Sequence, residues 1–162
     1  MAEPVSREDR TIRRATASDA RALAELRHEF RAGIAPPIEP REAFVTRCSA
    51  WMAGALGGSG AHWQCWVACA GADIVGCVWL LRLPKIPNPV GEAESHGYVT
   101  NLYVRAPFRG GTGSGLLEAA LAWCRAERVD SVILWPTPES RTLYARHGFR
   151  GGDDLMELSI SG

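Results

Sequence analysis

Residues 109–115, with the sequence RGGTGSG, place four glycines directly after an arginine. They follow the strand-like residues Leu102, Tyr103 and Val104 and precede a helical spacing of apolar residues that begins at Leu117. A helix start exposes unpaired N–H groups and a partial positive charge, so it attracts anions. Glycines let a phosphate approach that backbone, and Arg109 adds a charge-assisted donor. The segment therefore predicts a phosphate-binding site, with a plain glycine-rich connection as the structural alternative.

The spacing of these glycines argues against two common phosphate-binding motifs. A dinucleotide fingerprint that starts at Gly111 would need a third glycine at position 116, where the chain has Leu116. A P-loop would end in Gly-Lys-Ser or Gly-Lys-Thr, and this segment has no lysine. NAD-dependent enzymes and nucleoside triphosphatases are therefore poor interpretations.

Composition indicates one ordinary globular domain. The 162 residues are 46% apolar and 22% charged, with a formal net charge of zero, so no overall field favours nucleic acid. The N-terminal residues lack the apolar stretch of a signal peptide, and no later segment has the length of a membrane span. Five cysteines without CxxC spacing are expected to be mostly buried free thiols. We expect a cytoplasmic protein that binds neither nucleic acid nor membrane.

The elements that position this segment follow from hydrophobic periodicity and turn residues. Strands are expected at 10–16, 62–70, 72–83, 96–104, 131–135 and 154–160. Helices are expected from Ser18 and Asp19 with the apolar face Leu23, Leu26 and Phe30, over 41–56, from the glycines to about Glu127, and from Thr137 to Gly148. An antiparallel meander followed by one strand–helix–strand crossover predicts a mixed α/β sheet.

Two segments resemble conserved motifs of one enzyme family. Residues 102–117, LYVRAPFRGGTGSGLL, resemble motif A of the GNAT N-acetyltransferases, and residues 134–149, LWPTPESRTLYARHGF, resemble motif B. The resemblance implies an α/β (α+β) fold with a mixed, mostly antiparallel sheet of six to seven strands, about four helices and a splayed central strand pair. It implies a single GNAT domain over 9–160 after a flexible N-terminus, 1–8.

The resemblance implies an enzyme that uses acetyl-CoA, without a metal, to acetylate a primary amine of a small molecule or peptide by direct attack. The backbone of Leu102, Tyr103 and Val104 would pair with the pantetheine amides and polarise the thioester. Residues expected to bind the pyrophosphate are Arg109, Gly110, Gly111, Thr112, Gly113, Ser114 and Gly115. Thr137 and Ser140 would bond a pantetheine amide; they stand where many members have Asn and Ala. The glycine loop is one residue shorter than the usual pattern, so either Arg109 or the glycines shift register.

Tyr144 is the residue that the resemblance assigns to protonation of the departing thiolate; the structural alternative is a helix tyrosine packed on the sheet. Many members carry a glutamate base on the fourth strand, whereas this chain has Tyr98 and Asn101 there. Glu94 or His96, just before them, is the expected proton acceptor.

The amine acceptor is expected between residues 31–40 and 83–97, where Glu39, Glu92 and Glu94 could attract a cationic amine. The tryptophans are interpreted as core rather than as an aromatic cage. A monomer or homodimer is expected. Two other functions stay open: a non-catalytic acyl-CoA-binding regulatory module, and a structural domain that binds an anion but not CoA.

Overall fold

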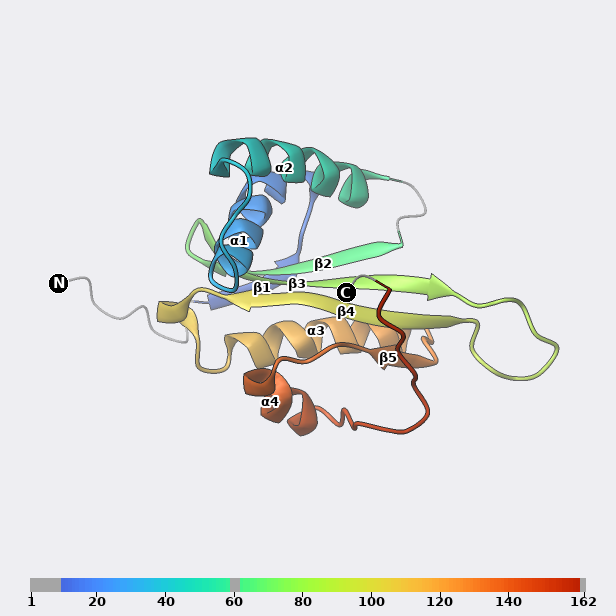
Figure 1. Cartoon of the computed structure of the whole chain (residues 1–162). Coiled ribbons are helices and arrows are strands. Elements are labelled where there is room, and N and C mark those ends of the chain that lie inside the picture. Colours follow the sequence, from blue (N-terminus) through green and yellow to red (C-terminus); the bar gives the residue numbers. More distant parts are fainter. Residues whose placement is uncertain (1–9, 59–61, 161–162) are drawn as a thin grey trace.

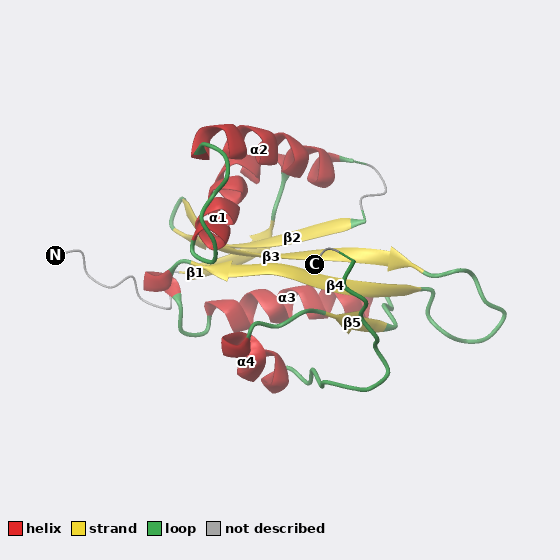
Figure 2. Cartoon of the chain, in the orientation of Figure 1, coloured by secondary structure: helices red, strands yellow, loops and turns green. Residues whose placement is uncertain are grey.

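The computed structural model describes residues 10–58 and 62–160, which form a sheet with helices on both faces (Figures 1 and 2). The strands are β1 (Arg10–Arg14), β2 (Trp63–Ala70), β3 (Asp73–Pro84), β4 (Ser95–Val104) and β5 (Ser131–Ile133). The helices are α1 (Ala20–Ala32), α2 (Arg41–Gly57), α3 (Thr112–Ala126) and α4 (Arg141–Arg146). The sheet order is β1-β2-β3-β4-β5, antiparallel except for the parallel β4–β5 pair. The predicted mixed α/β fold is confirmed.

The central strands are apolar on both faces because helices cover both (Figure 1). On β2, Cys65, Val67 and Cys69 pack with α1 and α2, while Trp66 and Ala68 pack with α3. Since alternate strand residues point to opposite faces, this run divides cleanly between two cores. The sheet is therefore held by packed side chains on both faces.

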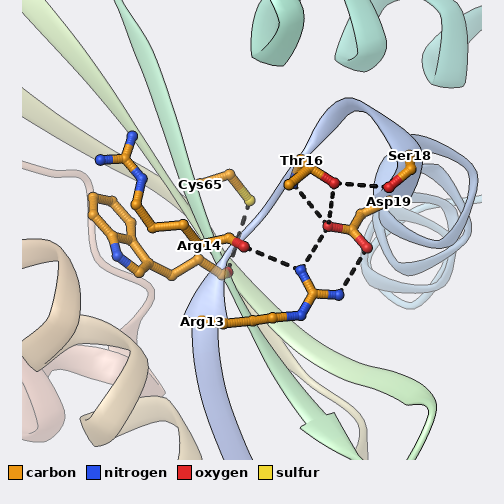
Figure 3. Close-up of polar contacts among 7 residues, drawn as sticks. Arg13, Arg14, Thr16, Ser18, Asp19 and Cys65 are labelled. Atoms are coloured by element: carbon orange, nitrogen blue, oxygen red, sulfur yellow. Dashed lines mark hydrogen bonds and ion pairs between the residues drawn. The ribbon is translucent and has the colours of Figure 1, made fainter.

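The start of α1 is fixed to β1 by a buried carboxylate (Figure 3). Asp19, the N-cap residue of α1, accepts two hydrogen bonds from Arg13, at 2.8 and 2.9 Å, and one from the Thr16 N–H at 2.8 Å. The bond from Arg13 is the main reason why the pKa of Asp19 lies below its ordinary value. The expected helix start is confirmed, with the carboxylate turned back to the preceding strand.

The end of the chain differs from the prediction. Residues 154–160 form no strand, so the described sheet has five strands rather than six to seven. Alternation of apolar residues suggested a strand there, but a strand also needs a hydrogen-bonding neighbour. The segment is exposed and is held beside Trp135 by the bond from the indole Nε1 to Glu157 Oε2, 2.6 Å. The predicted flexible N-terminus, 1–8, lies outside the described residues.

Four of the five cysteines are buried free thiols, as expected, and Cys48 is partly exposed. Burial raises the pKa of the Cys77 thiol to about 12. Within 10–58 and 62–160, no helix combines the length and apolarity needed to span a bilayer.

Candidate functional site

The β4–β5 ladder contains only three residue pairs and ends at Tyr98 and Ile133. Beyond that point β4 continues to Val104 while β5 has ended, so the strands separate as predicted. A groove of about 650 Å³ lies along this unpaired part of β4, and Leu102, Tyr103 and Val104 line it. No β5 residue pairs with this stretch, so apart from the Val104 carbonyl, which Arg109 Nε bonds, its backbone can meet a ligand that hydrogen-bonds like a strand.

The glycine loop forms one end of the groove. Gly110 and Gly111 have φ of 94° and 104°, in the left-handed region that favours glycine, and Gly111 is the N-cap residue of α3. The first i→i−4 bond at this end runs from the Gly115 N–H to the Gly111 carbonyl, 3.0 Å. The preceding N–H groups, from Thr112 to Ser114, therefore have no acceptor within the helix. Gly110, Gly111, Gly113 and Ser114 line the groove.

Two arginines add positive charge to the groove. Arg109 lines it and donates from Nε to the Val104 carbonyl at 3.0 Å, which holds the guanidinium beside the end of β4. Arg146 on α4 also lines the groove. Sequence reasoning identified Arg109 and missed Arg146, whose place depends on how α4 packs against the loop. Together with the start of α3, these cations suit a polyanionic group such as a pyrophosphate.

Thr112 and Gly115, both expected in the phosphate site, do not line this groove. Thr112 is buried; its Oγ1 donates to the Phe108 carbonyl at 2.6 Å and accepts from Arg10 Nη1 at 2.8 Å. A Cβ at Gly115 would lie 2.7 Å from Ile12 Cδ1. Both residues therefore pack the loop against β1, and the groove-facing positions are their neighbours.

Tyr144 lies in the same groove, together with Thr137 and Ser140. Its ring packs edge-on against Phe149, with centroids 5.6 Å apart, and burial raises the pKa of its hydroxyl. The phenol is therefore protonated at neutral pH and available as a proton donor. The Thr137 hydroxyl donates to Ser140 Oγ at 3.1 Å.

A contact between the two helices fixes α4 against the glycine loop. Ser114 Oγ and His147 Nε2 lie 2.7 Å apart, which joins the first turn of α3 to the C-cap residue of α4. The glycine loop and the helix that carries Tyr144 therefore hold a defined relative position.

His96 lies near the other end of β4, about 20 Å along the strand from Leu102 at ~3.3 Å per residue, and Glu94 directly precedes the strand. The Glu94 carboxylate accepts a bond from the Asn88 N–H at 3.2 Å, and His96 Nδ1 lies 2.7 Å from Ser131 Oγ. Neither residue lines the groove.

The other acidic side chains of these two loops are paired. Glu39 forms an ion pair with Arg47, and Glu92 lies 3.2 Å from Lys85 Nζ. Their charge is therefore largely compensated, which weakens the expected attraction for a cationic amine.

Helix α1 supplies groove residues that sequence reasoning missed. Glu29 and Phe30 line the groove. The Glu29 carboxylate accepts two bonds from Arg105, at 2.8 and 3.0 Å, and the Phe30 ring stacks on Tyr103 with centroids 5.4 Å apart. Phe30 is the last residue of the apolar face expected for this helix, beyond the buried Leu26. That position at the end of the apolar face is the feature of the sequence that could have indicated a groove residue. In the part of the chain that the structure describes, no cluster of three or more His, Cys, Asp or Glu side chains could hold a metal ion.

Known structures share this architecture. A predicted acetyltransferase from Clostridium acetobutylicum, solved with acetyl-CoA, has a TM-score of 0.74 and 21% identity, over 93% of this chain and 96% of that one. A GCN5-related N-acetyltransferase from Ralstonia eutropha JMP134 has a TM-score of 0.75 and 20% identity, over 94% and 99%. Glucosamine-6-phosphate N-acetyltransferase from Arabidopsis thaliana has a TM-score of 0.65 and 18% identity, over 94% and 99%. At these identities the likeness shows the fold.

Sequence comparison with curated proteins gave no match. A family-level comparison did: residues 23–149 match the model described as the acetyltransferase (GNAT) family. The matched residues include most of α1, the whole sheet except β1, the glycine loop and α4.

Proposed function

The chain belongs to the GNAT acetyltransferase family, and from this premise we propose that it transfers an acetyl group from acetyl-CoA to a primary amine of a small molecule or peptide. GNAT acetyltransferases use acetyl-CoA, and one similar structure was solved with it. One observation carries the proposal for this chain. The unpaired edge of β4, the glycine loop and Tyr144 all line one groove.

The groove residues fit the parts of acetyl-CoA. The backbone of Leu102, Tyr103 and Val104 would bond the pantetheine amides, and the N–H groups of Gly111, Gly113 and Ser114 would bond the pyrophosphate, assisted by Arg109 and Arg146. Gly113 has no side chain at the groove surface, where a Cβ would lie 3.8 Å from Leu143 Cδ2. Thr137 and Ser140 would contribute hydroxyls from the opposite wall.

The chemistry assigned to the protein is positioning and proton transfer. Acetyl-CoA supplies a thioester that an amine can attack directly: the amine nitrogen bonds to the acetyl carbon and the carbon–sulfur bond breaks. A β4 N–H polarises the acetyl oxygen. Tyr144 Oη donates a proton to the departing sulfur. The amine releases its proton to water, and water returns a proton to the Tyr144 phenolate. Glu94 or His96, which do not line the groove, would take part only through water.

The test is an acetyl-CoA turnover assay over amines, amino acids, polyamines and peptides, which measures free thiol and acetylated product. We expect thiol release that depends on the amine. Acetyl-CoA at a hundred times its Kd should also stabilise the fold by about 2.7 kcal/mol. Stabilisation without turnover on any amine would favour the non-catalytic acyl-CoA-binding module. Equal stabilisation by phosphate would favour an anion-binding structural domain.

A further inference from the structure

A second cavity, of about 340 Å³, lies between α1, α2 and the sheet, next to the groove. Five aromatic residues line it: Phe44, Trp51, Trp63, Trp79 and Tyr98. Among its lining residues Arg27, from α1, is the only charged one. Its volume is at the small end of the roughly 300–1,000 Å³ that is usual for ligand pockets, which suits a molecule of a few functional groups.

Strand β4 joins this cavity to the groove. Thr100 and Asn101 line the cavity, whereas the next residues, Leu102 and Tyr103, line the groove. The β3–β4 ladder is irregular here, and Asn101 has a φ of 53°. Such an irregularity changes the direction in which successive side chains point. A ligand in the cavity therefore lies next to the backbone expected to hold the acetyl group.

The one charged group among the cavity-lining residues, the Arg27 guanidinium, has no carboxylate partner. Arg27 Nη1 donates to Asn101 Oδ1 at 3.1 Å, and among the described residues no carboxylate lies within 4.0 Å of this guanidinium. Burial and the charge of Arg31 both lower the pKa of Arg27. The indole N–H of Trp79 also has no acceptor in the described part of the chain, but it is fully buried and out of reach of a ligand in the cavity. A partly buried guanidinium without a carboxylate partner favours a ligand that brings acceptor oxygens.

We propose that the acceptor is a free α-amino acid with an aromatic or large aliphatic side chain, whose carboxylate pairs with Arg27 while its side chain packs on the aromatic walls. The inference rests on the proposed acetyl transfer. A single guanidinium matches the charge of one carboxylate and binds it through two parallel bonds. The amine and the carboxylate of an α-amino acid are bonded to the same α carbon. A carboxylate bound to Arg27 therefore holds the amine beside β4. Arg27 and Arg31 disfavour polyamines, which bring only positive charge.

The experiment compares acceptors that differ only in the carboxylate. For the wild type we expect kcat/KM to be at least tenfold higher for L-phenylalanine than for L-phenylalaninamide or 2-phenylethylamine. Arg27→Gln should raise the KM for L-phenylalanine at least tenfold and leave kcat/KM for the amide within about threefold. Arg27→Lys, which keeps the charge, should retain part of the preference. Unchanged acetyl-CoA affinity and an unchanged melting temperature show that each variant is folded.

Two results would overturn the inference. Equal kcat/KM for L-phenylalanine and its amide in the wild type would mean that no carboxylate is recognised, while acetyl transfer itself would stand. An equal loss for both acceptors in Arg27→Gln would mean that Arg27 only supports Asn101. Calorimetry of L-phenylalanine with the CoA-bound protein separates the two proposals. Binding that depends on Arg27 without any acetylation would support the cavity and refute the transferase.

Discussion

The groove and the cavity meet at β4 but differ in the kind of atoms that would contact a ligand. The groove contains three backbone features, namely the stretch of β4 beyond the β5 ladder, two glycines with positive φ and the first turn of α3, with side chains of α1 and α4 along its walls. The cavity consists of side chains from α1, α2, β2, β3 and β4, with Arg27 among aromatic rings. A backbone site needs a local sequence, because glycine and helix starts are properties of adjacent residues. A side-chain site needs only that residues far apart in the sequence come together in the fold. It therefore leaves no recognisable motif in the sequence.

The largest expected effect tests whether turnover in the groove depends on the Tyr144 side chain. Tyr144→Phe removes one hydroxyl and leaves the ring on Phe149. We expect kcat to fall by about 10²-fold, the usual scale for a lost general acid, with acetyl-CoA affinity nearly unchanged. Steady-state kinetics on the best acceptor, with binding measured separately, provide the comparison. Equal kcat in the variant and the wild type would leave the groove as a backbone site only.

The next effect concerns the side-chain network that supports the cavity side of the sheet. Asp19→Asn removes the charge that Arg13 and Thr16 bond at the start of α1. We expect a loss of about 2 kcal/mol in unfolding free energy at pH 7, measured by urea denaturation. Asp73→Asn, at the exposed first residue of β3, is the matched control, with a change below about 0.5 kcal/mol.

The same pair predicts a pH dependence. The pKa of Asp19 is lowered in the folded state, so its contribution is fully present above the unfolded value of about 3.9 and is lost as the pH falls through the lower folded pKa. The stability difference between wild type and Asp19→Asn should therefore shrink on acidification below about pH 4. A difference that stays constant down to pH 2 would show that the carboxylate charge does not stabilise the fold.

The smallest expected effect separates two glycines of one helix turn. Gly113→Val adds a branched side chain at the groove, and acetyl-CoA affinity should fall about tenfold, or about 1.4 kcal/mol. Gly115→Ala instead directs its Cβ at Ile12, so affinity should change less than twofold while stability falls slightly. Calorimetric titration measures both. If Gly115→Ala weakened acetyl-CoA binding as much as Gly113→Val, the groove would not be the phosphate site.

This division explains what could be predicted from the sequence. The glycine loop and Tyr144 were identified because each lies within one short segment, and the structure places both beside one groove. Glu29, Phe30 and Arg146 were missed because their positions depend on how α1 and α4 cross the sheet. Arg27 gave no signal, since its partner Asn101 lies 74 residues away.

Two further residues and one strand show the limit of local patterns. Glu94 or His96 was predicted to be the proton acceptor, but neither lines the groove, because no local pattern indicates at which end the β4–β5 ladder opens. The alternating apolar residues at 154–160 are compatible with a strand, but no described strand pairs with this segment. Pairing is a property of two segments, so one segment cannot predict it.

The short β4–β5 ladder also bears on self-association. An unpaired strand edge is usually a hazard, because another polypeptide can add to it and begin aggregation. Here the open stretch of β4 lies in a groove with residues of α1 and α4 along its walls. A foreign strand would carry side chains that alternate above and below its backbone and need space on both faces. Pantetheine carries only two methyl groups and a hydroxyl beside its amides, so walls that admit pantetheine would at the same time exclude a foreign strand and oppose β-aggregation.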